Sequence, residues 1–272
     1  MKPIISVEEF KKIKENVLIF DVGNGMSSLK NYEENHLENA IYIDLNSHLS
    51  EISENPANGG RHPLPKVKDF LKTIQNFGID SSKHIVLYDM NFGANAAARF
   101  WWMLRAIGHE KVQVLDGGFQ AAKKEGFSMN NIIPKIFPVN DHLSYFNHWD
   151  LPLVTIKEVE NLSKNLSQII VDVREAGRYN GDYEPIDLKA GHIPNAINIP
   201  FQNNLDKNGL FLNPENLKKN YEIFFQKKDC KSVVIHCGSG VTACHTIIAL
   251  DYAGFEIPAL YVGSWSEWSR NF

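Results

Sequence analysis

Residues 236–244, His-Cys-Gly-Ser-Gly-Val-Thr-Ala-Cys, combine a cysteine with the spacing of an anion-binding loop. This segment directly follows the apolar run 232–235, and small residues separate Cys237 from a helical pattern that begins at about Thr242. Small residues let backbone N–H groups turn inward, and the positive end of the helix points at the same place. Such a loop favours the thiolate, which is the nucleophilic form of cysteine. The sequence therefore predicts a nucleophile at position 237.

Two alternatives exist for this loop. Cysteine phosphatases use the same strand–loop–helix arrangement but need an arginine six positions after the cysteine, where this chain has Ala243. An inert, buried cysteine is the other alternative, and the complete glycine-rich loop argues against it.

The other two cysteines are not assigned to the loop. Cys244 lies about two helical turns from Cys237, too far for a disulfide, and its side chain is predicted to have a packing role. Cys230 is assigned no role.

The overall composition fits a globular protein, with 43% hydrophobic residues, 22% charged residues and a net charge of −4. This balance argues against nucleic-acid binding. No apolar run approaches the roughly 20 residues that a membrane span needs, and the N-terminus lacks a signal-peptide pattern, so we expect a cytoplasmic protein without a membrane partner. The spacing of His192 and His236 around Cys237 matches no compact zinc site. We expect neither a metal nor another cofactor.

The chain repeats itself after about 150 residues, which indicates an internal duplication. In this alignment Asp89 stands opposite Cys237, and His36 stands opposite His192, so these histidines are predicted to be structural. Five pairs of segments match in the same order in the two halves. The first pair lies near the start of each half, and the last pair lies near its end. The pairs are 5–10 with 154–159, 18–22 with 169–173, 36–40 with 192–196, 86–89 with 234–237, and 117–119 with 262–265.

Short apolar strands alternate with helical stretches in both halves, which predicts doubly wound α/β domains with mostly parallel sheets and helices on both faces. The predicted boundaries are a first domain over 1–125, a linker over 126–150 and a second domain over 151–272. Ligands of such sheets lie beyond the carboxyl ends of the strands, where Cys237 is placed. The predicted strands are 17–22, 41–44, 84–89, 112–116, 168–173, 196–199, 233–236 and 260–262, and a helix is predicted over 94–108.

With these motifs in order, the chain resembles the tandem-domain rhodanese-type sulfurtransferases over essentially its whole length. The resemblance implies two rhodanese-like domains, of which the first has Asp89 in place of the catalytic cysteine. It also implies that the Cys237 thiolate takes sulfur from a small-molecule donor as a persulfide and passes it to a second thiol or to cyanide. The segments that carry the resemblance are 172–174, 177–179, 191–196, 237–243 and 263–268.

The residues after the cysteine bear on the donor. Thiosulfate-preferring rhodaneses carry two cationic side chains there, whereas this chain has Gly238 and Ser239 and is similar to the 3-mercaptopyruvate sulfurtransferases. That resemblance implies a relay of Ser239, His62 and Asp44 that assists the thiol and the carbonyl of the donor.

Donor binding follows from the same resemblance. Arg178 corresponds to the arginine that binds the donor carboxylate, for which the planar guanidinium is suited. A second arginine usually precedes Gly-His-Ile-Pro, and this chain has none there. Either Lys189 or Arg61 replaces it, or thiosulfate competes better as donor. The loop residues expected to contact the donor are Gly238, Gly240, Val241 and Thr242.

Two other functions stay open at this point. The main activity could be thiosulfate:cyanide sulfur transfer, or the chain could be a non-catalytic sulfur-relay or protein-interaction module, a role in which the cysteine is typically lost. The expected acceptor is a thiol, such as thioredoxin or a small thiol, or cyanide. The sequence does not set the oligomeric state, and a two-domain chain of this kind needs no partner subunit.

Overall fold

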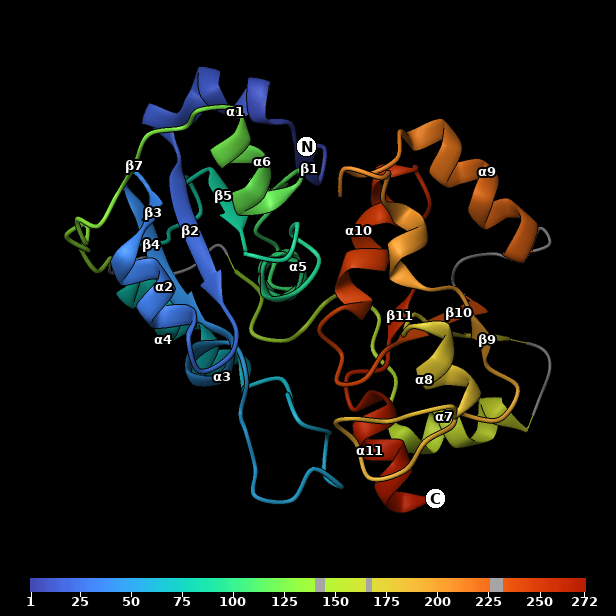
Figure 1. Ribbon diagram of the computed structural model, residues 1–272. Helices are drawn as coiled ribbons and strands as arrows, with labels where there is room; N and C mark the ends of the chain where they lie inside the picture. Colours follow the sequence, from blue (N-terminus) through green and yellow to red (C-terminus); the bar gives the residue numbers. More distant parts are fainter. Residues whose placement is uncertain (140–144, 165–167, 226–231) are drawn as a thin grey trace. The chain divides into compact units, whose positions relative to one another are not determined.

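The structure is a computed structural model that describes residues 1–139, 145–164, 168–225 and 232–272 (Figure 1). The chain forms two compact units. The first consists of residues 1–50, 65–150 and 208–210, and the second of residues 51–64, 151–207 and 211–272. Part of the predicted linker, residues 140–144, lies outside the described residues.

The first unit is built on a parallel sheet in the order β1-β6-β5-β2-β4. Four of these strands were predicted from apolar runs, and the fifth, β1, was missed because a strand of two residues has no readable periodicity. A separate antiparallel pair joins β3 and β7. The bounds are β1 Ile4–Ile5, β2 Leu18–Gly23, β3 His36–Leu37, β4 Ala40–Asp44, β5 Ile85–Tyr88, β6 Val112–Leu115 and β7 Met129–Asn130.

Helices cover both faces of the first sheet, because neighbouring residues of a strand point to opposite sides. Ile19 packs in a cluster with Phe10 of α1 and Phe119 of α6, and Figure 1 shows these two helices together. The next residue, Phe20, instead contacts Phe100 of α5 edge-on. The helices are α1 Val7–Ile13, α2 Ser28–Glu34, α3 Leu45–His48, α4 Val67–Asn76, α5 Ala96–Ala106 and α6 Gly118–Lys124, with a 3₁₀ turn η1 Lys14–Asn16.

The second unit repeats this plan on a parallel sheet in the order β11-β10-β8-β9. On one face, Ile170 and Val234 pack with Val159 of α7 and Trp268 of α11. The strands are β8 Ile169–Asp172, β9 Ile197–Asn198, β10 Val233–His236 and β11 Ala259–Leu260. The helices are α7 Ile156–Ser163, α8 Ala176–Asn180, α9 Pro214–Phe225, α10 Ala243–Tyr252 and α11 Ser264–Asn271, with a 3₁₀ turn η2 Phe201–Asn204.

Both units begin their first helix in the same way, which supports the duplication seen in the sequence. Ser6 caps α1 and Thr155 caps α7, each in a reciprocal capping box with the glutamate three residues later. The prediction of two α/β domains with mostly parallel sheets is confirmed. Among the helices of the described ranges, none is long and apolar enough to cross a membrane.

Candidate active site

Cys237 lies where strand β10 ends, at the carboxyl edge of the second sheet. Its side chain is buried, as are those of Ser239 and Val241. Helix α10 begins at Ala243 with Thr242 as its N-cap residue, as the sequence predicted. The loop 237–242 therefore faces the positive end of a ten-residue helix, an arrangement that stabilises an anion.

The cysteine loop is tied to the start of helix α11. Trp265 N donates to Cys237 O at 3.0 Å, and Ser266 N donates to Gly238 O at 2.8 Å. Gly240 has φ +71°, and a Cβ at this position would lie 2.5 Å from the carbonyl oxygen of Val262. Only glycine combines this backbone conformation with this close approach.

Ser239 and His62 form a hydrogen-bonded pair in the second unit. Ser239 Oγ lies 2.8 Å from His62 Nδ1, although 177 residues separate them in sequence. The segment that carries His62 is anchored on α11, since Gly59 N donates to Glu267 Oε1 at 2.8 Å and Arg61 N donates to Ser266 Oγ at 3.1 Å. This part of the predicted relay is therefore assembled in the second unit, beside Cys237.

Two arginines approach the cysteine loop. A Cβ built on Gly238 would lie 3.0 Å from Arg61 Nη2 and 3.5 Å from Arg178 Nη2. Lys189, the other residue considered as a second cation, instead donates from Nζ to the carbonyl oxygen of Phe272 at 2.8 Å. The structure thus places Arg61, and not Lys189, next to Arg178 at the loop.

Two carboxylates that the sequence analysis did not assign hold these arginines. Glu184 accepts from Arg178 Nη2 at 2.7 Å and from its Nε at 3.1 Å. Asp187 accepts from Arg61 Nε at 2.9 Å, from Arg178 Nη2 at 3.4 Å and from Arg270 Nη1 at 3.4 Å. Although burial opposes the charge, the bonds to Glu184 and the nearby charges raise the pKa of Arg178 above its ordinary value. Carboxylates therefore hold both guanidinium groups in place, and Arg178 keeps its positive charge.

Arg174, which follows strand β8, is paired with a buried carboxylate of that strand. It donates from Nε to both oxygens of Asp172 at 3.0 Å and from Nη2 to Oδ2 at 2.6 Å. Its guanidinium also lies over the ring of Trp265, 4.8 Å from the centroid, and bonds Gly191 O. This ion pair is almost fully buried, so Arg174 is a structural residue.

The predicted structural role of the paired histidines agrees with the contacts of both rings. His36 stacks on Tyr32, and His192 stacks on Tyr179, each with ring centroids 4.0 Å apart. Each Nδ1 also lies within hydrogen-bond distance of the carbonyl oxygen of the stacked tyrosine. Equal geometry in both units indicates a shared packing role.

Asp44 belongs to the first unit and is the N-cap residue of α3. Its Oδ1 accepts from Asn46 N at 3.0 Å and from Ser47 N at 2.9 Å, while the Tyr42 hydroxyl donates to Oδ2 at 3.2 Å. A capping role thus explains why an aspartate ends this strand. Its part in the relay stays a prediction.

Cys244 does not join the site. It is buried, and its Sγ donates to the carbonyl oxygen of Gly240 at 3.4 Å. Cys237 is buried as well, and no disulfide joins it to Cys244. Cys230 lies outside the described residues.

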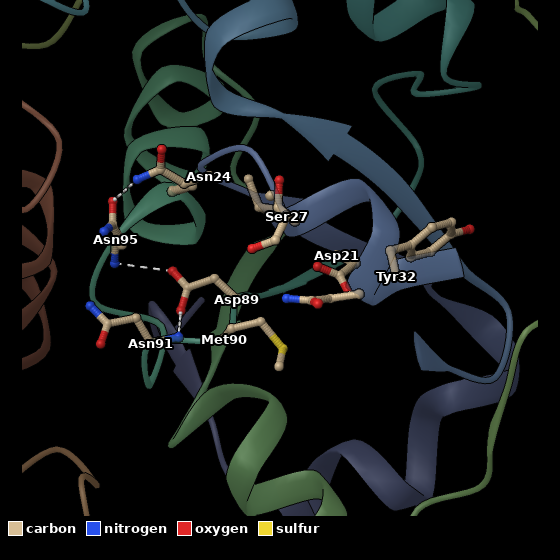
Figure 2. A pocket seen from close by; sticks show the side chains of 13 residues that line it. Asp21, Asn24, Ser27, Tyr32, Asp89, Met90, Asn91 and Asn95 are labelled. Carbon is tan, nitrogen blue, oxygen red and sulfur yellow. Dashed lines mark hydrogen bonds between the residues drawn. The ribbon is translucent and has the colours of Figure 1, made fainter. Parts of the chain in front are cut away.

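In the first unit, Asp89 takes the place of the cysteine at the end of strand β5 (Figure 2). Its Oδ1 accepts from the N–H groups of Asn91 and Gly93, both at 2.8 Å. Its Oδ2 accepts from Asn95 N at 3.0 Å and Ala97 N at 3.1 Å. The first loop is therefore also an anion cradle, and the anion is the chain's own carboxylate.

The fold and the two loops define a class of protein, a duplicated parallel α/β domain with one cysteine loop and one loop that a carboxylate fills. The family model of the rhodanese-like domain matches residues 6–125 and again residues 155–271. The chain belongs to the rhodanese family, and within it to the two-domain sulfurtransferases.

Named relatives support this grouping. A probable 3-mercaptopyruvate sulfurtransferase of Pseudomonas aeruginosa is 38% identical over 241 residues, which cover 87% of this chain and 82% of the relative. A thiosulfate sulfurtransferase of Mus musculus is 36% identical over 251 residues, covering 89% of this chain and 80% of the relative. The solved structure of the 3-mercaptopyruvate sulfurtransferase from Leishmania major matches with a TM-score of 0.87 at 29% identity, over 100% of this chain and 75% of that one.

Proposed function

We propose that this chain transfers sulfur from 3-mercaptopyruvate, through a persulfide on Cys237, to a thiol or to cyanide. One observation carries the proposal. Cys237 shares its loop with Ser239, which pairs with His62 at 2.8 Å, and two arginines lie against the intervening Gly238. A nucleophile, a hydrogen-bond donor for a carbonyl and cations for a carboxylate are the groups that a 2-oxo acid with a terminal sulfur requires.

In the first step, the thiolate of Cys237 attacks the sulfur of the donor. A sulfur–sulfur bond forms, the carbon–sulfur bond breaks, and its electron pair passes to the carbon to give the enolate of pyruvate, which then takes up a proton. Charge develops on the former carbonyl oxygen, where the Ser239 hydroxyl can donate a hydrogen bond. His62 orients and polarises this hydroxyl, and Asp44 is proposed as the carboxylate partner of His62.

The donor carboxylate is proposed to lie between Arg61 and Arg178. Planar guanidinium groups bind carboxylates through parallel hydrogen bonds, and Glu184 and Asp187 hold both side chains in place before the donor arrives. Arg61 thereby replaces the arginine that this chain lacks before Gly191. The backbone of Gly238, Gly240, Val241 and Thr242 is proposed to stabilise the persulfide anion.

In the second step, an acceptor thiolate attacks the outer sulfur of the persulfide. The new persulfide leaves with the acceptor, and the Cys237 thiolate is restored without a net redox change. Thioredoxin or a small thiol fits this role, and cyanide would leave as thiocyanate. A covalent intermediate that separates donor and acceptor predicts ping-pong kinetics.

Thiosulfate is the second candidate donor. The same two arginines can hold its dianionic sulfonate end, and a relative of this chain is named a thiosulfate sulfurtransferase. A non-catalytic relay module is the rival of another class. It would accept sulfur on Cys237 without turning over.

The experiment compares kcat/KM for 3-mercaptopyruvate and for thiosulfate in the wild type and in Ser239→Ala. We expect a loss of about 10²-fold with 3-mercaptopyruvate and of less than about tenfold with thiosulfate, because only the first donor has a carbonyl to assist. Ser128→Ala, which changes an exposed serine of the first unit, is the matched control. Equal losses with both donors would contradict the role of Ser239, and a wild type without turnover on either donor would favour the relay module.

A further inference from the structure

The first unit contains a cavity of about 120 Å³ at the carboxyl ends of strands β2 and β5 (Figure 2). A single water needs only about 10–15 Å³, so the cavity is large enough for a small organic molecule. The chain leaves β2 for β4 on one side and returns to β5 on the other side of β2. Open α/β sheets bind their ligands at such a reversal of strand order.

The lining of this cavity is polar and rich in hydrogen-bond acceptors. Asp21 and Asp89 contribute carboxyl groups, and four asparagines, two serines and Tyr32 contribute amides and hydroxyls. None of the described residues that line it is Lys, Arg or His. Asp89 is committed to four backbone N–H groups. Asp21 is the carboxyl group left to meet a ligand.

In the second unit, the aspartate that corresponds to Asp21 is paired with a guanidinium group. Asp21-Val22-Gly23 matches Asp172-Val173-Arg174 in the duplication, and both aspartates lie at corresponding positions of β2 and β8. Asp172 binds the guanidinium of Arg174 through both carboxylate oxygens. The first unit therefore keeps the carboxylate of this pair and lacks the guanidinium.

In the first unit, Gly23 stands at the position that matches Arg174, and the space beside it does not admit a cationic side chain. A Cβ on Gly23 would lie 2.4–2.6 Å from the ring and hydroxyl of Tyr42. The Tyr42 hydroxyl is in turn held by Ser28 at 2.8 Å. Asp21 is nevertheless only 4% exposed. Burial and the charge of Asp89 raise the pKa of Asp21 to about 7, although a bond from Tyr88 opposes this, and a cation in the cavity would relieve that penalty.

We propose that the cavity binds a small guanidinium compound through Asp21, in the way that Asp172 binds the guanidinium of Arg174. A guanidinium group presents only donors, in a planar fork that matches a carboxylate, and the amide and hydroxyl oxygens of the cavity accept its remaining N–H groups. Figure 2 shows Asn24 and Ser27 among these side chains. The site is independent of Cys237 and of sulfur transfer.

The test is calorimetric titration of the full chain with methylguanidinium chloride, followed by thermal unfolding at saturation. We expect saturable binding and a higher Tm for the wild type, and a loss of affinity of at least about tenfold in Asp21→Asn. Asp69→Asn, which changes an exposed aspartate of the same unit, should bind like the wild type. Tetramethylammonium chloride at equal concentration controls for ionic strength and should give neither effect.

A second measurement does not depend on a variant. The ¹³C resonance of the Asp21 carboxyl group, followed against pH, should show its titration midpoint fall when methylguanidinium is added. The proposal would be overturned if methylguanidinium did not bind the wild type, or if it bound Asp21→Asn equally well. It would also be overturned if the titration midpoint of Asp21 did not change, or if methylammonium bound as tightly as methylguanidinium.

Discussion

The two halves of this chain solve the same local problem in opposite ways. Each ends a parallel strand in a loop, and each has a residue of positive φ three positions after Asp89 or Cys237, namely Phe92 in one loop and Gly240 in the other. In the first half the buried carboxylate of Asp89 fills the cradle. In the second half Cys237 stands at the matching position, close to the N-terminus of helix α10, and we propose that this loop stabilises a reacting anion. We therefore propose that the first loop serves stability and the second serves chemistry.

The charged residues close to the two loops also differ between the halves. In the second half Asp172 and Arg174 form a closed pair, and Glu184 and Asp187 hold the arginines at the loop. In the first half Asp21 keeps only the carboxylate of the corresponding pair. The comparison teaches that two copies of one fold can keep the same strand, loop and aspartate while the residue at the loop and the ionic partners of the aspartate differ.

The largest expected contrast comes from removing the group in each cradle. Asp89→Ala leaves four backbone N–H groups without their acceptor, of which those of Gly93 and Ala97 are buried, and we expect the free energy of unfolding to fall by about 4–6 kcal/mol. Cys237→Ala should change it by no more than about 1 kcal/mol while abolishing turnover. Urea denaturation and steady-state assays measure both, with Asp69→Ala as the control. Similar losses of stability in the two variants would show that the loops do not differ as described.

The second contrast concerns the aspartates beneath the loops. Asp172→Asn leaves the buried guanidinium of Arg174 without its closest charge, so we expect a loss of about 3–5 kcal/mol. Asp21→Asn removes a carboxyl group whose cavity offers no cation from its described lining, and near pH 7 it should not destabilise the protein. Denaturation of both variants at one pH tests this. Equal destabilisation would mean that Asp21 has a cationic partner after all.

A third prediction uses pH to separate the contribution of Asp21 to the free energy of unfolding. Its pKa is about 7 in the folded protein and close to the ordinary 3.8 in the unfolded chain, so the folded state holds a proton that the unfolded state releases between these values. Its contribution to stability is fully present below about pH 4 and is lost as pH rises through about 7. Relative to the wild type, Asp21→Asn should therefore gain about 2–4 kcal/mol between about pH 4 and pH 8. Parallel stability curves for the two proteins would refute this assignment.

The smallest expected effect is at the residue of positive φ in the catalytic loop. Gly240→Ala introduces a Cβ that meets the carbonyl of Val262, and we expect a loss of about 1–3 kcal/mol together with reduced turnover. Gly238→Ala, which carries no such backbone strain, should leave stability nearly unchanged and raise KM, because its Cβ approaches Arg61. The comparison fails if both variants lose the same stability.

Much of this molecule could be predicted from its sequence, because local patterns determine it. Apolar runs marked the principal strands, and the loop after β10 identified Cys237. The pairing of Arg61 with Asp187 could not be predicted, since 126 residues separate them and no periodicity links them. The stretch before Gly191 has no arginine, and its carboxylates Glu184 and Asp187 instead hold Arg178 and Arg61. The available signal for these ion pairs was the presence of two unassigned carboxylates, Glu184 and Asp187, in a chain with two predicted anion-binding arginines.

The most direct test of the account is the mass of the intact protein after incubation with 3-mercaptopyruvate in the absence of an acceptor. We predict that the wild type gains one sulfur atom, that peptide mapping places it on Cys237, and that Cys244→Ser gains it equally. Cys237→Ser should gain none, and added thiol should remove the sulfur from the wild type. A sulfur gained by Cys237→Ser, or none gained by the wild type, would contradict the claim that the second loop alone carries the chemistry.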